Sequence, residues 1–89
     1  MTKLVVSNTF LCKRSILWSN RIGENVDGML RTIEQMPGVG SSLVPESIAS
    51  EFGPQVLKAV VSPYEIIYEY SRDEDVVYVY DLLYGPNAH

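Results

Sequence analysis

The spacing of hydrophobic residues changes along the chain and divides it into two parts. Residues 3–7 form a short β-branched run that predicts a strand. Residues 9–22 and 25–36 carry apolar side chains at helical spacing, so they predict two consecutive helices. From residue 55 the period becomes two, which is typical of strands separated by short turns and predicts an antiparallel meander. The expected strands are residues 55–61, 64–70 and 76–84.

Polar and helix-breaking residues mark the expected ends of these elements. Ser7 is suited to cap the first helix, because its hydroxyl can accept a hydrogen bond from a free backbone N–H. Gly23 is expected to separate the two helices, and residues 37–44 to form a loop. Pro45 and Gly53 bracket a further helical turn or two. The second helix has the clearest apolar stripe and is expected to pack on the sheet with Val26, Met29, Leu30, Ile33 and Met36.

The length of 89 residues is that of one small domain, residues 1–89, with a single thin core. No apolar run reaches the roughly 20 residues of a membrane span, and no signal-peptide pattern follows the first Met, so we expect a soluble cytoplasmic protein. Cys12 is the one cysteine, which excludes an internal disulfide and every multi-cysteine metal site. We interpret it as a buried or half-buried helix residue, and we expect neither a metal nor a cofactor.

The net charge of −4 is unevenly distributed along the chain. Residues 1–44 hold five Lys/Arg and three Asp/Glu, whereas residues 45–89 hold two and eight. An acidic surface repels phosphate backbones, so direct nucleic-acid binding is not expected. Lys13, Arg14 and Arg21 form the one cationic cluster, at helical spacing on the first predicted helix. This cluster is either an ordinary solvated face or a contact site for an acidic partner.

Tyrosines recur along the predicted meander, at Tyr64 and Tyr68 in its middle strand and at Tyr80 in its last strand. Both faces of these strands are largely apolar or aromatic, so each face needs a cover. The helices can cover one face. The tyrosines are either packed locally or form a surface that meets a partner.

The order of elements and several short motifs resemble the RelE/ParE toxin superfamily. Residues 7–10 (Ser-Asn-Thr-Phe) look like the Ser-Pro-x-Phe segment that opens the first helix of that family, and residues 37–40 (Pro-Gly-Val-Gly) are similar to its Pro-x-x-Gly loop. Residues 57–68 resemble its Leu-Arg-x-Val-Val-x-x-Tyr-Arg-Ile-x-Tyr stretch. The resemblance implies an α+β fold with an N-terminal strand, a helix hairpin and the meander in one small sheet. It also implies the toxin of a type II toxin–antitoxin pair, neutralised by a cognate antitoxin.

The departures from the family pattern indicate how such a toxin would act. RNA-cleaving members rely on Arg and Lys projecting from the sheet. Lys58 keeps a cation, but Glu65, Glu69 and Asp81 stand where Arg is frequent, and a carboxylate there opposes the charge that RNA cleavage must stabilise. The resemblance therefore implies the ParE-like branch, which binds a protein target, with DNA gyrase as the implied target. We expect a homodimer, or a heterotetramer with the antitoxin, and no enzymatic activity.

Two alternatives stay open at this stage. One is a ribosome-dependent mRNA endoribonuclease of the RelE type, with Lys58, Tyr84 and His89 as its catalytic residues, since histidine suits acid–base chemistry near neutral pH. The other is a non-toxic binding module that has the toxin fold.

Overall fold

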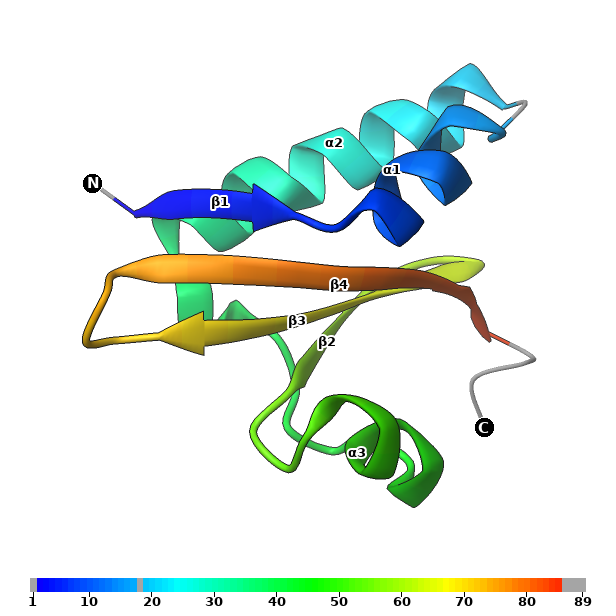
Figure 1. The fold of residues 1–89 in the computed structure, drawn as a ribbon. Helices are drawn as coiled ribbons and strands as arrows, with labels where there is room; N and C mark the ends of the chain where they lie inside the picture. The colour runs from blue at the N-terminus through cyan, green and yellow to red at the C-terminus, as the bar shows by residue number, and fades with distance from the viewer. Residues whose placement is uncertain (1, 18, 86–89) are drawn as a thin grey trace.

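A computed structural model of the chain describes residues 2–17 and 19–85. Within them lie three α-helices, one 3-10 turn and four strands, and Figure 1 shows their arrangement. In chain order the elements are β1 (Lys3–Val6), α1 (Asn8–Ser15), α2 (Asn20–Gln35), η1 (Pro37–Val39), α3 (Glu46–Phe52), β2 (Leu57–Val61), β3 (Tyr64–Ser71) and β4 (Val76–Tyr84).

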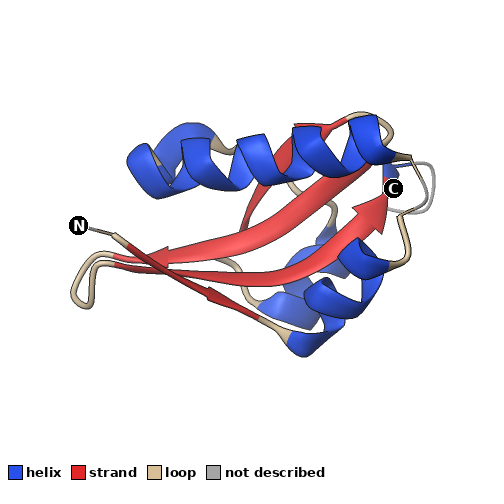
Figure 2. Cartoon of the chain, turned by 90° about the horizontal axis from the view of Figure 1, so that it is seen from above, coloured by secondary structure: helices blue, strands red, loops and turns tan. Residues whose placement is uncertain are grey.

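The four strands, red in Figure 2, form one sheet in the order β1-β4-β3-β2. β2, β3 and β4 pair antiparallel in succession, so the predicted meander is confirmed. β1 pairs parallel with β4, from Lys3 opposite Val76 to Val6 opposite Val79. The sheet is therefore mixed and not wholly antiparallel, and β1 accompanies only the first part of β4.

A bulge between β3 and β4 changes which face each later residue of β4 occupies. The register shifts at Ile67/Tyr68, so Tyr68 lies opposite Val79 while Ile67 lies opposite Asp81, and Tyr80 is the extra residue. Because neighbouring strand residues point to opposite faces, one extra residue reverses the alternation that follows. A simple alternation along this strand therefore assigns the wrong face to the residues that follow Tyr80.

Helices cover both faces of the sheet, with α1 and α2 on one side and α3 on the other (Figure 1). On the first side Phe10 of α1 and Val26 and Ile33 of α2 are buried against the sheet. This confirms that the apolar stripe of the second helix faces the core, although Met36, just beyond the end of α2, is 57% exposed. On the second side Ile48 of α3 is buried in a smaller cluster with Ile67.

The boundary between the first two helices differs from the prediction. Ser7 caps α1 as expected, and its hydroxyl accepts a hydrogen bond from the Phe10 N–H at 3.0 Å. α1 ends at Ser15, however, and α2 starts at Asn20, where the Ser19 side chain caps it. Gly23 lies buried inside α2 instead of ending a helix. A Cβ at Gly23 would stand 2.9 Å from the Arg14 guanidinium, so the glycine allows α1 and α2 to approach closely.

The loop after α2 is fastened to the sheet by one buried side chain. Tyr68 is 0% exposed, and its hydroxyl donates to the Pro37 carbonyl at 2.7 Å and accepts from the Gly40 N–H at 2.8 Å. Ser41 then forms two backbone hydrogen bonds with Lys58 of β2. The α2–α3 connection is thus held against the sheet at several points.

Cys12 is exposed on α1, so the expectation that it is buried or half-buried is wrong. The reason is the facing of the helix, because α1 buries Phe10 and a residue two positions later points roughly to the opposite side. No helix among residues 2–17 and 19–85 has both the length and the apolar content that crossing a membrane requires.

Candidate functional site

Four charged side chains come together where the sheet meets α3 and α1. Lys58 of β2 and Asp81 of β4 both lie opposite Ile67 of β3, and Glu65 precedes Ile67 by two residues, so these side chains share the face that α3 covers. Lys13, which lies on α1 and not on the sheet, forms an ion pair with Asp81. We refer to Lys58, Glu65, Asp81 and Lys13 as the charge row.

The charge row consists of two ion pairs. The Lys58 ammonium lies 3.5 Å from the Glu65 carboxylate, and the Lys13 ammonium lies 2.7 Å from Asp81 Oδ1. The carboxylate side chains are only 7% and 11% exposed for Glu65 and Asp81. Asp81 Oδ1 also accepts the Leu82 N–H at 2.8 Å. A buried carboxylate is stable only when it is paired, so each lysine of the row is committed to a partner inside the chain.

Tyrosines and further carboxylates extend this face toward the β3–β4 turn. Tyr80 stacks on Phe52 of α3 with ring centroids 5.7 Å apart, and its hydroxyl donates to Glu69 at 3.4 Å. Burial raises the pKa of Tyr80, and the neighbouring Glu69 charge raises it further. The hydrogen bond from Tyr78 to Glu74 raises the pKa of Tyr78. Both phenols therefore stay protonated at neutral pH and act as hydrogen-bond donors rather than as bases.

The cationic cluster predicted from the sequence is divided between two helices. Lys13 and Arg14 lie on α1, but Arg21 lies on α2, because the first predicted helix is in fact parts of two helices. Arg14 donates two hydrogen bonds to Asp27 of α2, at 3.0 and 2.8 Å. The hydrogen bond raises the pKa of Arg14 and lowers the pKa of Asp27. Arg14 therefore joins the two helices, Lys13 joins α1 to the sheet, and Arg21 is an exposed residue of α2.

The three tyrosines predicted to meet a partner do not share a surface. Tyr68 is fully buried, burial raises the pKa of its hydroxyl, and it has no surface to offer a partner. Tyr64 is half-buried on the side of α1 and α2, where its ring packs edge-on against Tyr84 with centroids 5.6 Å apart. Tyr80 lies on the opposite side of the sheet. The structure therefore removes Tyr68 as a contact residue and separates Tyr64 from Tyr80.

The candidate nuclease residues are not brought together in the described part of the chain. Lys58 shares the α3 face with Asp81, whereas Tyr84 packs against Tyr64 on the side of α1 and α2. Tyr84 also lies three residues beyond Asp81, which is about 10 Å along a strand. Lys58 and Tyr84 therefore lie on different faces of the sheet. His89 lies outside the described residues.

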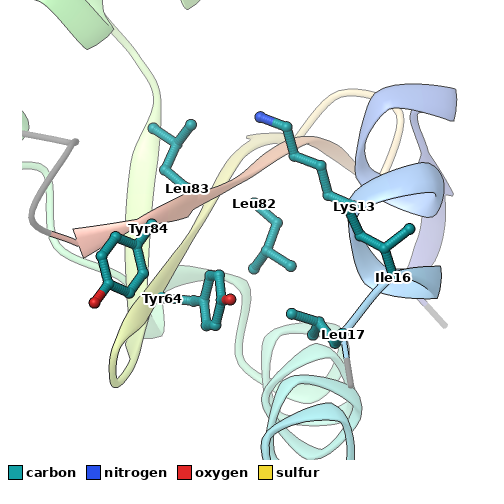
Figure 3. Close-up of a pocket in the computed structure, with 7 residues that line it drawn as sticks. All are labelled: Lys13, Ile16, Leu17, Tyr64, Leu82, Leu83 and Tyr84. Carbon is teal, nitrogen blue, oxygen red and sulfur yellow. The ribbon is translucent and has the colours of Figure 1, made fainter. Parts of the chain in front are cut away.

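A cavity of about 510 Å³ opens at the end of β4, beside the end of α1 (Figure 3). Sequence reasoning missed this cavity, because the segments that form it are far apart in the chain and the bulge reassigns the faces of β4. The one sequence feature that points to the cavity is the pair of adjacent apolar residues directly after α1, Ile16 and Leu17. The lining residues are Lys13, Ile16, Leu17, Tyr64, Leu82, Leu83 and Tyr84. In residues 2–17 and 19–85, no three His, Cys, Asp or Glu side chains gather as a metal site would require.

Comparisons with known proteins identify the fold. No protein-family model matches the sequence, and no curated protein is similar enough to count as a relative. Among solved structures, the chain superposes on a chain of the intact E. coli RelBE toxin–antitoxin complex with a TM-score of 0.70 and 17% identity, over 94% of this chain and 96% of that one.

Two further structures agree with this match. The isolated E. coli RelE toxin gives a TM-score of 0.72 and 16% identity over 94% of this chain and 84% of that one. A YoeB/ParE toxin from Agrobacterium tumefaciens gives a TM-score of 0.72 and 13% identity, over 93% and 98% of the two chains. The chain therefore has the fold of the RelE/ParE toxin superfamily, and the fold expected from its motifs is confirmed.

Proposed function

We propose that this chain is the toxin of a type II toxin–antitoxin pair, that it acts in the ParE-like manner by binding a protein, and that a cognate antitoxin neutralises it. The fold supports the toxin assignment. The charge row supports the protein-binding mode, and it is the observation on which the proposal depends.

The charge row works against a phosphate ligand. Cleavage of RNA without a metal needs cations aimed at the charge that develops on the phosphate. Lys58 and Lys13 already contact Glu65 and Asp81, so the row is neutral, and Glu69 adds a negative charge on the same face. A phosphate that displaced either carboxylate would leave it buried and unpaired, which costs several kcal/mol. A protein surface faces no such penalty, because it need not bring an anion to these lysines.

The target is tested with two assays on the purified chain. We expect it to inhibit supercoiling by DNA gyrase, the target that the ParE-like branch implies, and to leave ribosome-bound mRNA intact. Cleavage of ribosome-bound message that is lost in the Lys58→Ala variant would overturn the protein-binding mode and establish the endoribonuclease alternative. The Lys3→Ala variant is a matched control, because Lys3 lies on β1, across the sheet from β2.

Toxicity itself is tested by induction in a host cell. We expect growth arrest that co-expression of a small antitoxin gene, encoded next to this one, relieves. Harmless overproduction of the folded chain would instead support the non-toxic binding module. The toxin and antitoxin are expected to form a heterotetramer and the isolated toxin a homodimer, and light scattering on both samples measures these masses.

A further inference from the structure

The sheet face on the side of α3 is only partly covered by that helix. Ile67, Tyr80 and Leu83 pack with α3 in the smaller hydrophobic cluster. Figure 1 shows α3 beneath the sheet and away from the β3–β4 turn. The part of this face that lies nearer the turn is therefore the part to examine for a partner.

A row of three side chains crosses this part of the face. Val5 of β1 lies opposite Tyr78 of β4, and Tyr78 lies opposite Glu69 of β3. Val77 and Val79 point into the core under α1 and α2, so Tyr78 between them points to the other face. Val5 is 40% exposed, and the other two side chains are half-buried. We refer to Val5, Tyr78 and Glu69 as the open row.

Two carboxylates lie beside the Tyr78 ring. Glu69 is its neighbour across the strands, and Glu74 accepts the Tyr78 hydroxyl at 2.9 Å. The hydrogen bond to Glu74, together with the charges of Glu74 and Glu69, raises the pKa of Tyr78. The hydroxyl that Glu69 accepts, from Tyr80, lies 3.4 Å away, which is long for such a bond. Both carboxylates therefore keep most of their capacity to accept hydrogen bonds.

Neither of these carboxylates is neutralised within the chain. In residues 2–17 and 19–85 no Lys or Arg side chain lies within ion-pair distance of Glu69 or Glu74, unlike the two carboxylates of the charge row. The open row thus combines exposed apolar surface and a tyrosine ring with two unpaired negative charges.

We propose that the open row and Glu74 bind an apolar segment of the target protein that carries arginine. The inference rests on the proposed function for the identity of this protein as the target of the toxin.

An arginine side chain matches the chemistry of this surface. Its guanidinium is flat, so it can stack on the ring of Tyr78, and its five N–H donors can bond the carboxylates of Glu69 and Glu74 beside that ring. An apolar residue next to the arginine can contact Val5. A phosphate would instead be repelled by the two carboxylates. Charge complementarity therefore selects a cationic segment.

The position of Lys3 indicates the direction in which the segment extends. Lys3 lies at the corner of the same face, opposite Val76 and two residues before Val5, which is about 7 Å along β1. An arginine is repelled by this ammonium and attracted by the carboxylates. The segment is therefore expected to run from the open row toward Tyr80 and α3, away from Lys3.

The test uses the full chain labelled with nitrogen-15 and titrated with capped hexapeptides at about 0.15 M salt. The probe alternates arginine and leucine, and the control peptide has citrulline, which is neutral and of the same shape, in place of each arginine. We expect the amide signals of Val5, Glu69 and Tyr78 to shift with the arginine peptide, and the citrulline peptide to bind about tenfold more weakly. A single-stranded hexaribonucleotide should leave these signals in place.

Two double variants with the same change of charge test the location. Glu69→Gln with Glu74→Gln removes both carboxylates beside Tyr78 but keeps an accepting oxygen at each position. Glu24→Gln with Glu34→Gln removes two charges from α2, on the other side of the sheet. We expect the first pair to weaken binding of the arginine peptide about tenfold and the second to change it by less than about twofold.

Four results would overturn the inference. They are an absence of shifts in the open row, equal binding of the two peptides, an equal effect of the two double variants, and shifts of the open row caused by the oligonucleotide.

The two proposals fail separately. If the chain does not arrest growth but the arginine peptide binds at the open row, the toxin function fails and the binding surface stands. If the chain arrests growth but the peptide titration is negative, the function stands and the binding surface fails.

Discussion

The two hydrogen bonds of the Tyr68 hydroxyl hold the connection between α2 and the sheet, and the Tyr68→Phe substitution removes both while keeping the ring. Phenylalanine fills the same buried space, so the loss is confined to the bonds with the Pro37 carbonyl and the Gly40 N–H. Each bond contributes about 1 kcal/mol, and a polar group left without a partner adds to the cost. We expect the free energy of unfolding to fall by about 2–3 kcal/mol.

This loss is a large part of the stability of so small a domain, which is of the order of 0.05–0.15 kcal/mol per residue. The expected drop in Tm is about 10–20 °C. Urea unfolding followed by circular dichroism measures the free energy, and heating measures Tm. Tyr78→Phe is the matched control, because the Tyr78 hydroxyl bonds an exposed carboxylate of Glu74 and its loss should cost less than about 0.5 kcal/mol. Equal stability of the two variants would refute the reasoning.

Three further substitutions test the same framework by urea unfolding. Gly40→Ala puts a methyl group 2.6 Å from the Tyr68 hydroxyl and should cost more than about 1 kcal/mol, so a neutral result contradicts the packing. Glu65→Gln leaves the largely buried Lys58 without a counter-charge and should lower the free energy of unfolding by about 1–2 kcal/mol. An unchanged urea midpoint would contradict the Lys58–Glu65 ion pair. The Arg14 hydrogen bond lowers the pKa of Asp27, so the pair stabilises above about pH 4 and its contribution is lost as the pH falls through the lowered pKa. The free energy of unfolding should therefore differ between about pH 7 and pH 3, and the Asp27→Asn variant should show a smaller difference than the unmodified chain. Because the pair is partly exposed, the reduction should be at most about 1 kcal/mol, and an equal pH difference in both proteins would refute the role of the pair.

The parts of the fold that follow from local periodicity could be predicted from the sequence. The meander follows from a period of two over three runs, and the stripe through Val26 and Ile33 follows from helical spacing, since both patterns reflect which side chains must be buried. The parallel pairing of β1 with β4 joins residues more than 70 positions apart. A four-residue strand carries no local signal that identifies such a partner.

The candidate site was harder to predict because its contacts join distant elements. Lys13 and Arg14 are neighbours in the sequence and were grouped as one cluster, yet one contacts Asp81 of β4 and the other contacts Asp27 of α2. Gly23 was expected to end a helix on intrinsic preference alone. Inside α2 the glycine leaves room for the Arg14 guanidinium, a contact that only the packed structure shows.

The bulge in β4 links the charge row to the cavity at the end of β4. Val77 and Val79 face the core under α1 and α2, so an uninterrupted alternation would send Asp81 into that core and Leu82 to the other side. The extra residue at Tyr80 reverses this, so Leu82 enters the core and Asp81 turns toward Lys13. In the observed register the Asp81 carboxylate both neutralises Lys13 and accepts the Leu82 N–H. One inserted residue therefore creates the ion pair that disfavours a phosphate ligand and also turns Leu82 to the side where it lines the cavity at the end of β4.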